Sequence, residues 1–208
     1  MKMEADFVEY SVIPALTGEE VYAPEASSAV VIGDSTLAND ISILLAEKLQ
    51  NAGITNVGIL QQAIKGNRLL DDGAGILGMA YGEAMVDRFE RDVLNQPGVE
   101  RIFLKVGVND VVHPNCESLK DEARAVTAEE MIAGYKQLIQ QAHESGIEVY
   151  LFTRTAWKGY TRNVLGSDDV QWSPEIDQMR QDINAWIRSS DNPADGYIDL
   201  DFMCTDAT

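Results

Sequence analysis

The sequence has 208 residues, 45% of them hydrophobic, which is typical of one globular domain with a sizeable core. Sixteen basic side chains stand against 34 acidic ones, and the formal charge of -18 disfavours nucleic acid and anionic membrane surfaces as partners. The first residues carry no basic leader followed by an apolar core, and no apolar run is long enough to cross a bilayer. We therefore expect no membrane span, and localisation and oligomeric state stay open.

The sequence offers little for a metal or cofactor. Its two cysteines, Cys116 and Cys204, fit neither a disulfide framework nor a metal-ligand spacing, and only two histidines accompany them. Residues 73–78 satisfy G-x-G-x-x-G, the dinucleotide-binding pattern, but no convincing strand precedes them. We therefore expect no cofactor and no metal.

A short apolar run at residues 29–32 ends in Gly33, Asp34, Ser35 and Thr36. The run is rich in β-branched residues and too short for a helix, so it predicts a buried parallel strand. Ligands of open α/β sheets bind beyond the carboxyl ends of such strands, so we expect the Ser35 hydroxyl to face a site. The structural alternative is that Ser35 only caps a helix.

The segments after this strand alternate between β and α patterns. An amphipathic helix follows Ser35 and ends at Gly53, with an apolar stripe made by Leu37, Ile41, Leu44, Leu45, Leu49 and Ala52. Next come a strand at 57–61, a glycine-containing polar loop at 63–68, a helix at 84–94 and a strand at 101–106, which stops at Gly107. The pattern at Gly107 repeats that of Gly33.

The second half continues this alternation. Thr127 and Glu130 form a capping box, opening a helix whose expected buried stripe is Met131, Tyr135, Leu138, Ile139 and Ala142. A strand at 147–152, a helix that starts at Ser173-Pro174 and a strand at 196–200 complete the chain. The pattern predicts a three-layer α/β/α sandwich around a parallel sheet. We assign residues 1–28 to an irregular or edge segment and 29–208 to one domain.

Three of the predicted strand ends carry complementary chemistry. If the first three strands are neighbours, Ser35, Gly66 and Asn109 emerge on one rim of the sheet. Gly66 lacks a Cβ, so its N–H can approach a substrate closely, and the Asn109 amide supplies uncharged donors. With the Ser35 N–H they would form an oxyanion hole for a carbonyl attacked by Ser35. The plainer interpretation is a turn glycine and a turn asparagine.

Three motifs resemble the first sequence blocks of the SGNH or GDSL hydrolases, which are lipolytic and carbohydrate esterases. They are G-D-S-T at 33–36, A-I-K-G-N-R-L-L at 63–70 and G-V-N-D at 107–110, and the resemblance extends over residues 29–203. It implies a flavodoxin-like five-stranded parallel sheet, with Ser35 as nucleophile and Ser35, Gly66 and Asn109 as oxyanion donors. It also implies hydrolysis of a small, lipid or carbohydrate ester through an acyl-enzyme.

The sequence departs from that family at one decisive point. Members carry a D-x-x-H block beyond the fifth strand, which supplies the general-base histidine and its orienting aspartate, and neither is found here. A D-x-x-H string at 110–113 is interpreted as the tail of the third block, with His113 a loop residue, and His143 is expected to face solvent. An unassisted serine is a weak nucleophile, so we expect impaired hydrolysis. The alternative is a non-catalytic protein that binds an ester or acetylated glycan.

Two further features of the sequence have alternative interpretations. A phospho-receiver domain shares the architecture and would use Asp34 and Asp110, but no lysine follows the last strand as a receiver requires. Trp157, Tyr160 and Trp172 cluster after the fourth strand and either line a cleft or cover the sheet edge. We favour the second role for these aromatic residues.

Overall fold

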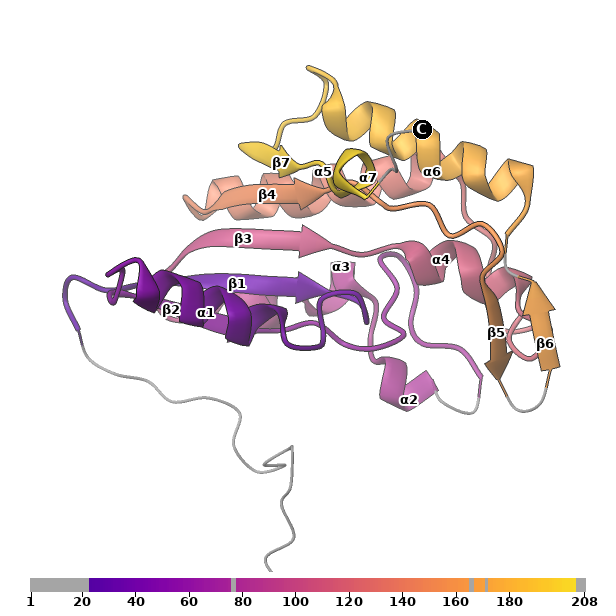
Figure 1. Cartoon of the computed structure of the whole chain (residues 1–208), viewed down its shortest axis with the longest axis horizontal. Coiled ribbons are helices and arrows are strands. Elements are labelled where there is room, and N and C mark those ends of the chain that lie inside the picture. Colours follow the sequence, from indigo (N-terminus) through magenta and orange to yellow (C-terminus); the bar gives the residue numbers. More distant parts are fainter. Residues whose placement is uncertain (1–22, 76–77, 165–166, 171, 205–208) are drawn as a thin grey trace, which may run out of the picture.

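The computed structural model describes residues 23–75, 78–164, 167–170 and 172–204 (Figure 1). The strands of these ranges are β1 (Ser27–Gly33), β2 (Val57–Gln61), β3 (Val99–Lys105), β4 (Glu148–Phe152), β5 (Thr161–Val164), β6 (Ser167–Val170) and β7 (Gly196–Ile198). The helices are α1 (Ile41–Asn51), α2 (Gly78–Tyr81), α3 (Met85–Phe89), α4 (Val108–Val112), α5 (Ala128–Glu144), α6 (Pro174–Arg188) and α7 (Leu200–Met203). A π-helical turn, η1 (Glu90–Leu94), continues α3, and a 3₁₀ turn, η2 (His113–Asn115), follows α4.

Five parallel strands form the central sheet in the order β2-β1-β3-β4-β7. This confirms the predicted α/β/α sandwich and its five-stranded, flavodoxin-like sheet. The chain leaves β1 toward β2 on one side and later returns to β3 on the other side. The carboxyl ends of β1 and β3 therefore lie at the point where the strand order reverses, which is where open α/β sheets bind ligands.

The main core lies on one face of this sheet. Alternate strand residues meet α3, α5 and α6 there, and all of the following are buried: Val30, Ile32, Ile102, Leu104, Val149, Leu151, Met131, Leu138, Ile139, Ile183 and Ile187. The expected stripe of α5 is buried as predicted, and the capping box at its start is present. In Figure 1, α1 lies in front of the sheet and α5 behind β4. Packing of these helices against the sheet thus holds the strands, and with them the strand ends, in place.

The helix after Ser35 differs from the prediction. A turn spans residues 34–37, and α1 starts only at Ile41 and ends before Gly53, which has φ +78°. Its apolar stripe is only partly buried: Ile41 is 40% and Leu44 50% exposed, whereas Leu45 and Leu49 are half-buried. The helix packs mainly on β2, the edge strand of the sheet, which offers too little surface to cover the stripe.

The structure also contains a hairpin that the sequence pattern did not predict. After β4 the chain forms β5 and β6, an antiparallel pair outside the main sheet. β1 starts at Ser27, within the segment assigned to 1–28, and residues 1–22 of that segment lie outside the described residues. No helix in the described ranges is both long and apolar enough to cross a bilayer.

Candidate active site

A cavity of about 430 Å³ opens at the carboxyl ends of β1 and β3. Its wall includes Ser35, Gly66 and Asn109, so the structure brings together the three residues that the sequence motifs singled out. They come from three separate loops, which follow β1, β2 and β3. The parallel arrangement of these neighbouring strands is what places the loops at one rim.

Ser35 sits in a turn that its neighbours fix. The Asp34 N–H donates to the carbonyl oxygen of Lys105 at 3.2 Å, and Asp34 Oδ1 accepts bonds from the Thr36 N–H at 2.9 Å and the Thr36 hydroxyl at 2.7 Å. A Cβ on Gly33 would overlap the Lys105 carbonyl, which explains the glycine before the turn. Within the described residues, neither the hydroxyl nor the N–H of Ser35 has a hydrogen-bond partner.

Gly66 occupies a position that only glycine fits. It has φ +82°, and a Cβ there would overlap the ring of Tyr81, which also lines the cavity. A larger residue would be both strained and blocked. The Gly66 N–H is not bonded to any described residue, so it remains available at the cavity wall.

Asn109 is oriented by the loop that carries Gly66. Gly107, with φ +104°, is the N-cap of α4, and the Asn109 Nδ2 donates one N–H to the carbonyl oxygen of Asn67 at 2.9 Å. An amide nitrogen has two N–H groups, so one donor of Asn109 stays uncommitted at the wall. The adjacent Asp110 fixes the same loop, because its carboxylate accepts the N–H groups of Leu69 and Leu70 at 2.8 to 3.1 Å.

Asn67 and Arg88 form a buried support that the sequence analysis missed. The Asn67 amide donates to the carbonyls of Tyr81 and Glu83, and its oxygen accepts two bonds from Arg88. Arg88 is also ion-paired with Asp92 at 2.8 Å. The polar loop pattern around Asn67 did signal a special loop, but its partners lie far along the chain and could not be assigned from spacing.

The cavity wall is rich in positive charge. Lys65, Lys105 and Arg154 line it beside a single acidic residue, Asp34. The Lys105 Nζ donates to the Thr36 hydroxyl at 2.7 Å. Burial lowers the pKa of Lys105, partly offset by the Asp34 carboxylate, which raises it, while Arg154 lowers it further. Burial also raises the pKa of Asp110, which lies behind the wall.

The guanidinium of Arg154 lies beneath the Gly107 turn. Its Nη2 donates to the carbonyl of Val106 at 3.1 Å and to the hydroxyl of Tyr135 at 2.8 Å, whereas its Nε has no partner among the described residues. A Cβ on Gly107 would overlap this guanidinium, so the glycine and the arginine fit together. Arg154 therefore supports the strand end that leads into Asn109.

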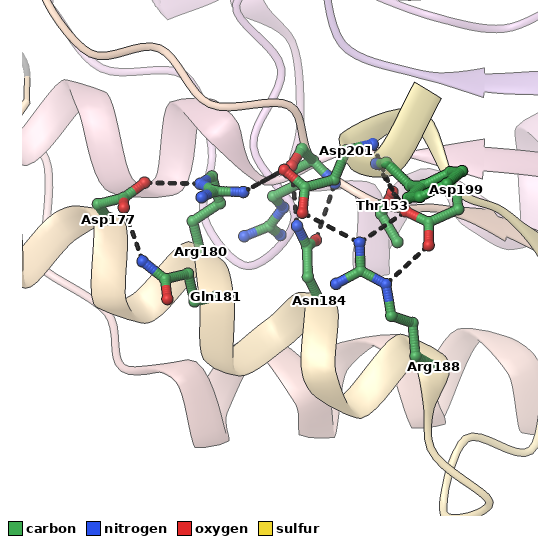
Figure 2. A network of polar contacts seen from close by, with 10 residues as sticks. Thr153, Asp177, Arg180, Gln181, Asn184, Arg188, Asp199 and Asp201 are labelled. Carbon is green, nitrogen blue, oxygen red and sulfur yellow. Dashed lines mark hydrogen bonds and ion pairs between the residues drawn. The ribbon is translucent and has the colours of Figure 1, made fainter. Parts of the chain in front are cut away.

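A polar network between β4, α6 and α7 fixes the backbone around Arg154 (Figure 2). Asn184 accepts the Arg154 N–H and donates to the Arg154 carbonyl, both at 2.8 Å. Arg180 lies between Asp177 and Asp201, and it also donates to the Arg154 carbonyl at 3.1 Å. These bonds hold the end of β4 against the cavity.

Neither histidine of the sequence lines the cavity. The prediction that His113 is a loop residue is wrong: it is fully buried in η2, with its ring 5.2 Å from that of Tyr81. His143, on α5, is exposed, as predicted, and its Nε2 lies 3.0 Å from Asp195 Oδ2. The described part of the cavity therefore contains no imidazole beside Ser35.

Two of the three aromatic residues that follow the fourth strand lie on the cavity wall. Trp157 and Tyr160 line the cavity, which corrects the interpretation that these aromatics only cover the sheet edge, whereas Trp172 is not part of the wall.

Asp110 is fully buried with both oxygens bonded, which does not suit the phospho-acceptor of a receiver domain. Among the described residues, no group of three potential ligands is placed to hold a metal ion.

Comparison with solved structures identifies the fold. The acetyl xylan esterase AlAXEase superposes with a TM-score of 0.58 at 22% identity, over 85% of this chain and 78% of its own. A putative lipolytic protein of the G-D-S-L family from Desulfitobacterium hafniense DCB-2 gives 0.56 at 19% identity, over 87% of this chain and 81% of its own. The chain has the SGNH hydrolase fold.

A third structure agrees with this assignment. The psychrotrophic esterase EstA from Pseudoalteromonas sp. gives a TM-score of 0.52 at 14% identity, over 86% of this chain and 79% of its own. No protein-family model and no curated protein matches the sequence. The similarity is therefore one of fold.

Proposed function

We propose that the cavity is the acyl-transfer site of a serine ester hydrolase. The Ser35 Oγ would attack the carbonyl carbon of an ester and give its proton to a base, forming a tetrahedral intermediate. Expulsion of the alcohol, which takes up a proton, would leave an acyl group on Ser35. Attack of water on that acyl group would then release the carboxylic acid and restore the serine.

The observation that carries this proposal is the set of uncommitted donors around Ser35. The N–H groups of Ser35 and Gly66 and one N–H of Asn109 have no acceptor among the described residues, and all three residues line the same cavity. Donors held in place before the reaction stabilise the oxyanion of the intermediate, and losing one such donor typically costs about 2.7 to 4 kcal/mol. The fold, which this chain shares with esterases, is consistent with the same chemistry.

The described wall of this cavity has no imidazole that could act as the base. Neither histidine lies on the cavity wall, so we propose that the 208-residue chain hydrolyses esters slowly. In a complete triad, loss of the histidine lowers turnover about 10⁶-fold. A plain consequence is that an imidazole added in solution can serve as the base.

Turnover of 4-nitrophenyl acetate tests the proposal. We expect a slow release of nitrophenol that rises with added imidazole, and the rise should be steeper for the wild-type chain than for Ser35→Ala. The alanine variant also measures the direct reaction of imidazole with the ester, which is subtracted. If both chains give the same rate at every imidazole concentration, Ser35 is not the nucleophile and the proposal is lost.

The absence of an imidazole from the cavity wall also favours a second candidate, a protein that binds an ester or acetylated glycan without hydrolysing it. Binding and turnover separate the two. Saturable binding of an ester by the wild-type chain, with no Ser35-dependent turnover at any imidazole concentration, would support the binding protein. Ser35-dependent turnover would exclude it.

A further inference from the structure

The charge of the cavity wall is opposite to that of the whole molecule. The sequence carries a formal charge of -18, yet three of the four charged residues on the wall are basic: Lys65, Lys105 and Arg154. Within the described residues none of these three forms an ion pair. In a chain with twice as many acidic as basic residues, carboxylate partners are not scarce.

Arg154 differs in this respect from the other arginines. Each of the other arginine side chains that the structure describes has at least one carboxylate partner; these are Arg68, Arg88, Arg91, Arg101, Arg124, Arg180 and Arg188. Arg154 is only 3% exposed, and its guanidinium donates to a carbonyl, a hydroxyl and the Met131 sulfur, all of them uncharged. Its positive charge is therefore buried without a negative counterpart in contact.

Lys105 is the cation best placed to meet a ligand. It is 8% exposed and lines the cavity, and within the described ranges its Nζ has a single hydrogen bond, to the Thr36 hydroxyl. An ammonium group has three donors, so two remain unused. Asp34 makes no ion pair with Lys105 among the described residues: its Oδ1 accepts the Thr36 hydroxyl, and its charge only partly offsets the effect of burial on the pKa of Lys105.

Burying cations without a partner is costly unless a counter-charge compensates them. Asp110 does not provide it on the wall, since its oxygens are bonded to the N–H groups of Leu69 and Leu70 and it does not line the cavity. We propose that the cavity binds esters that carry a carboxylate, and that Lys105 contacts this carboxylate while Arg154 adds positive potential behind it. This specifies the substrate class of the hydrolase proposed above.

Paired ligands that differ only in charge test this inference. Ser35→Ala protein, which cannot turn them over by the proposed route, is titrated with monomethyl succinate and its neutral dimethyl ester. A second pair is acetoxyacetate and its methyl ester, which place the carboxylate on the alcohol side instead of the acyl side. Isothermal titration calorimetry gives the four affinities.

We expect the charged member of at least one pair to bind about tenfold or more tightly, as for hydrogen bonds to a charged group. The pair that shows the preference tells on which side of the ester the carboxylate lies. Equal affinity within both pairs, or binding of neither, overturns the inference. This comparison needs no substitution of a buried cation, so it does not depend on the folding of such a variant.

Lys105→Met in the Ser35→Ala background then assigns the contact. Methionine keeps the aliphatic length and removes the charge, and the preference should vanish while the neutral esters bind as before. Lys48→Met, on the exposed last turn of α1, removes the same charge elsewhere and should leave the preference intact. If a thermal unfolding curve shows that Lys105→Met is folded and the variant keeps the preference, Lys105 is not the contact.

The two proposals fail in different ways. A chain that hydrolyses 4-nitrophenyl acetate through Ser35 but binds charged and neutral esters equally keeps the proposed function and loses this inference. A chain that prefers the charged esters but shows no reaction at Ser35 keeps the inference about the ligand and loses the catalytic function.

Discussion

The carboxyl ends of the five strands carry two polar clusters that use their hydrogen-bonding groups differently. At β4 and β7, Arg180 and Arg188 each bind two carboxylates, and Thr153 both donates to Asp199 and accepts the N–H of Asp201 (Figure 2). At β1 and β3, donors of the cavity wall are left uncommitted within the described residues. Polar groups that are already hydrogen-bonded hold the backbone in place, whereas donors without an acceptor are available to bind a ligand.

The largest effect should come from the cavity, on reaction and not on stability. Asn109→Ala removes one donor from the wall, and we expect the Ser35-dependent rate to fall about 10²- to 10³-fold. The rate with 4-nitrophenyl acetate and added imidazole measures this loss. Asn115→Ala is a matched control, because Asn115 lies on the adjacent turn, outside the cavity, and among the described residues its side chain bonds only to the Val111 carbonyl. Equal rates for the two variants would show that Asn109 is not a donor of the oxyanion hole.

A smaller effect, on stability, should come from the other cluster. Asn184→Ala takes away the fully buried amide that pairs with the N–H and carbonyl of Arg154. Leaving a buried N–H without a partner costs about 1 to 3 kcal/mol in the free energy of unfolding, which urea denaturation measures. Gln181→Ala, on the exposed side of α6, should change it by about 0.5 kcal/mol or less. An undiminished stability of Asn184→Ala would contradict the assigned role.

The smallest effect concerns pH. The hydrogen bond from Arg188 holds the pKa of Asp199 well below its usual range. A lowered carboxyl pKa adds stability above the ordinary value of about 3.9, and this stability is lost as the pH falls through the folded-state pKa. Because both side chains are partly exposed, solvent screening limits the pair to about 1 kcal/mol or less.

Arg188→Met should therefore be less stable than wild type at pH 7, and the difference should shrink as the pH is lowered below about 4. Urea midpoints across that range measure it. A difference that stays constant down to the lowest pH would show that the stability comes from packing of the Arg188 stem and not from its charge.

Local patterns predicted much of the fold. The β-branched run ending at Gly33 gave the first strand, and the capping box at Thr127 gave the start of α5, because both signals lie within a few adjacent residues. The apolar stripe predicted a helix, which is present as α1, but not how far it is buried, because burial depends on what lies under the helix, and here that is an edge strand. The hairpin β5–β6 carried too short a pattern to predict.

The sequence motifs predicted the residues of the candidate site, but not the buried side chains that hold its loops in place. Ser35, Gly66 and Asn109 each follow a strand in sequence, so the strand order was enough to bring them to one wall. Arg88 and Arg154 bond to groups 21 and 48 residues away, respectively, and no spacing rule links such positions. The charge of the wall emerged only when these loops were assembled.

The reaction of Ser35 with an activated ester tests the central claim most directly. Without an imidazole on the wall, release of the acyl group should be slow as well, so acetyl-Ser35 should accumulate when the protein is incubated with 4-nitrophenyl acetate. Proteolysis and mass spectrometry locate the acetyl group, with Ser35→Ala as the control for acetylated lysines. We expect the acetyl group on Ser35 of the wild-type chain. Acetylation confined to lysines and the amino terminus, equal in both chains, would contradict the assignment of this cavity as an acyl-transfer site.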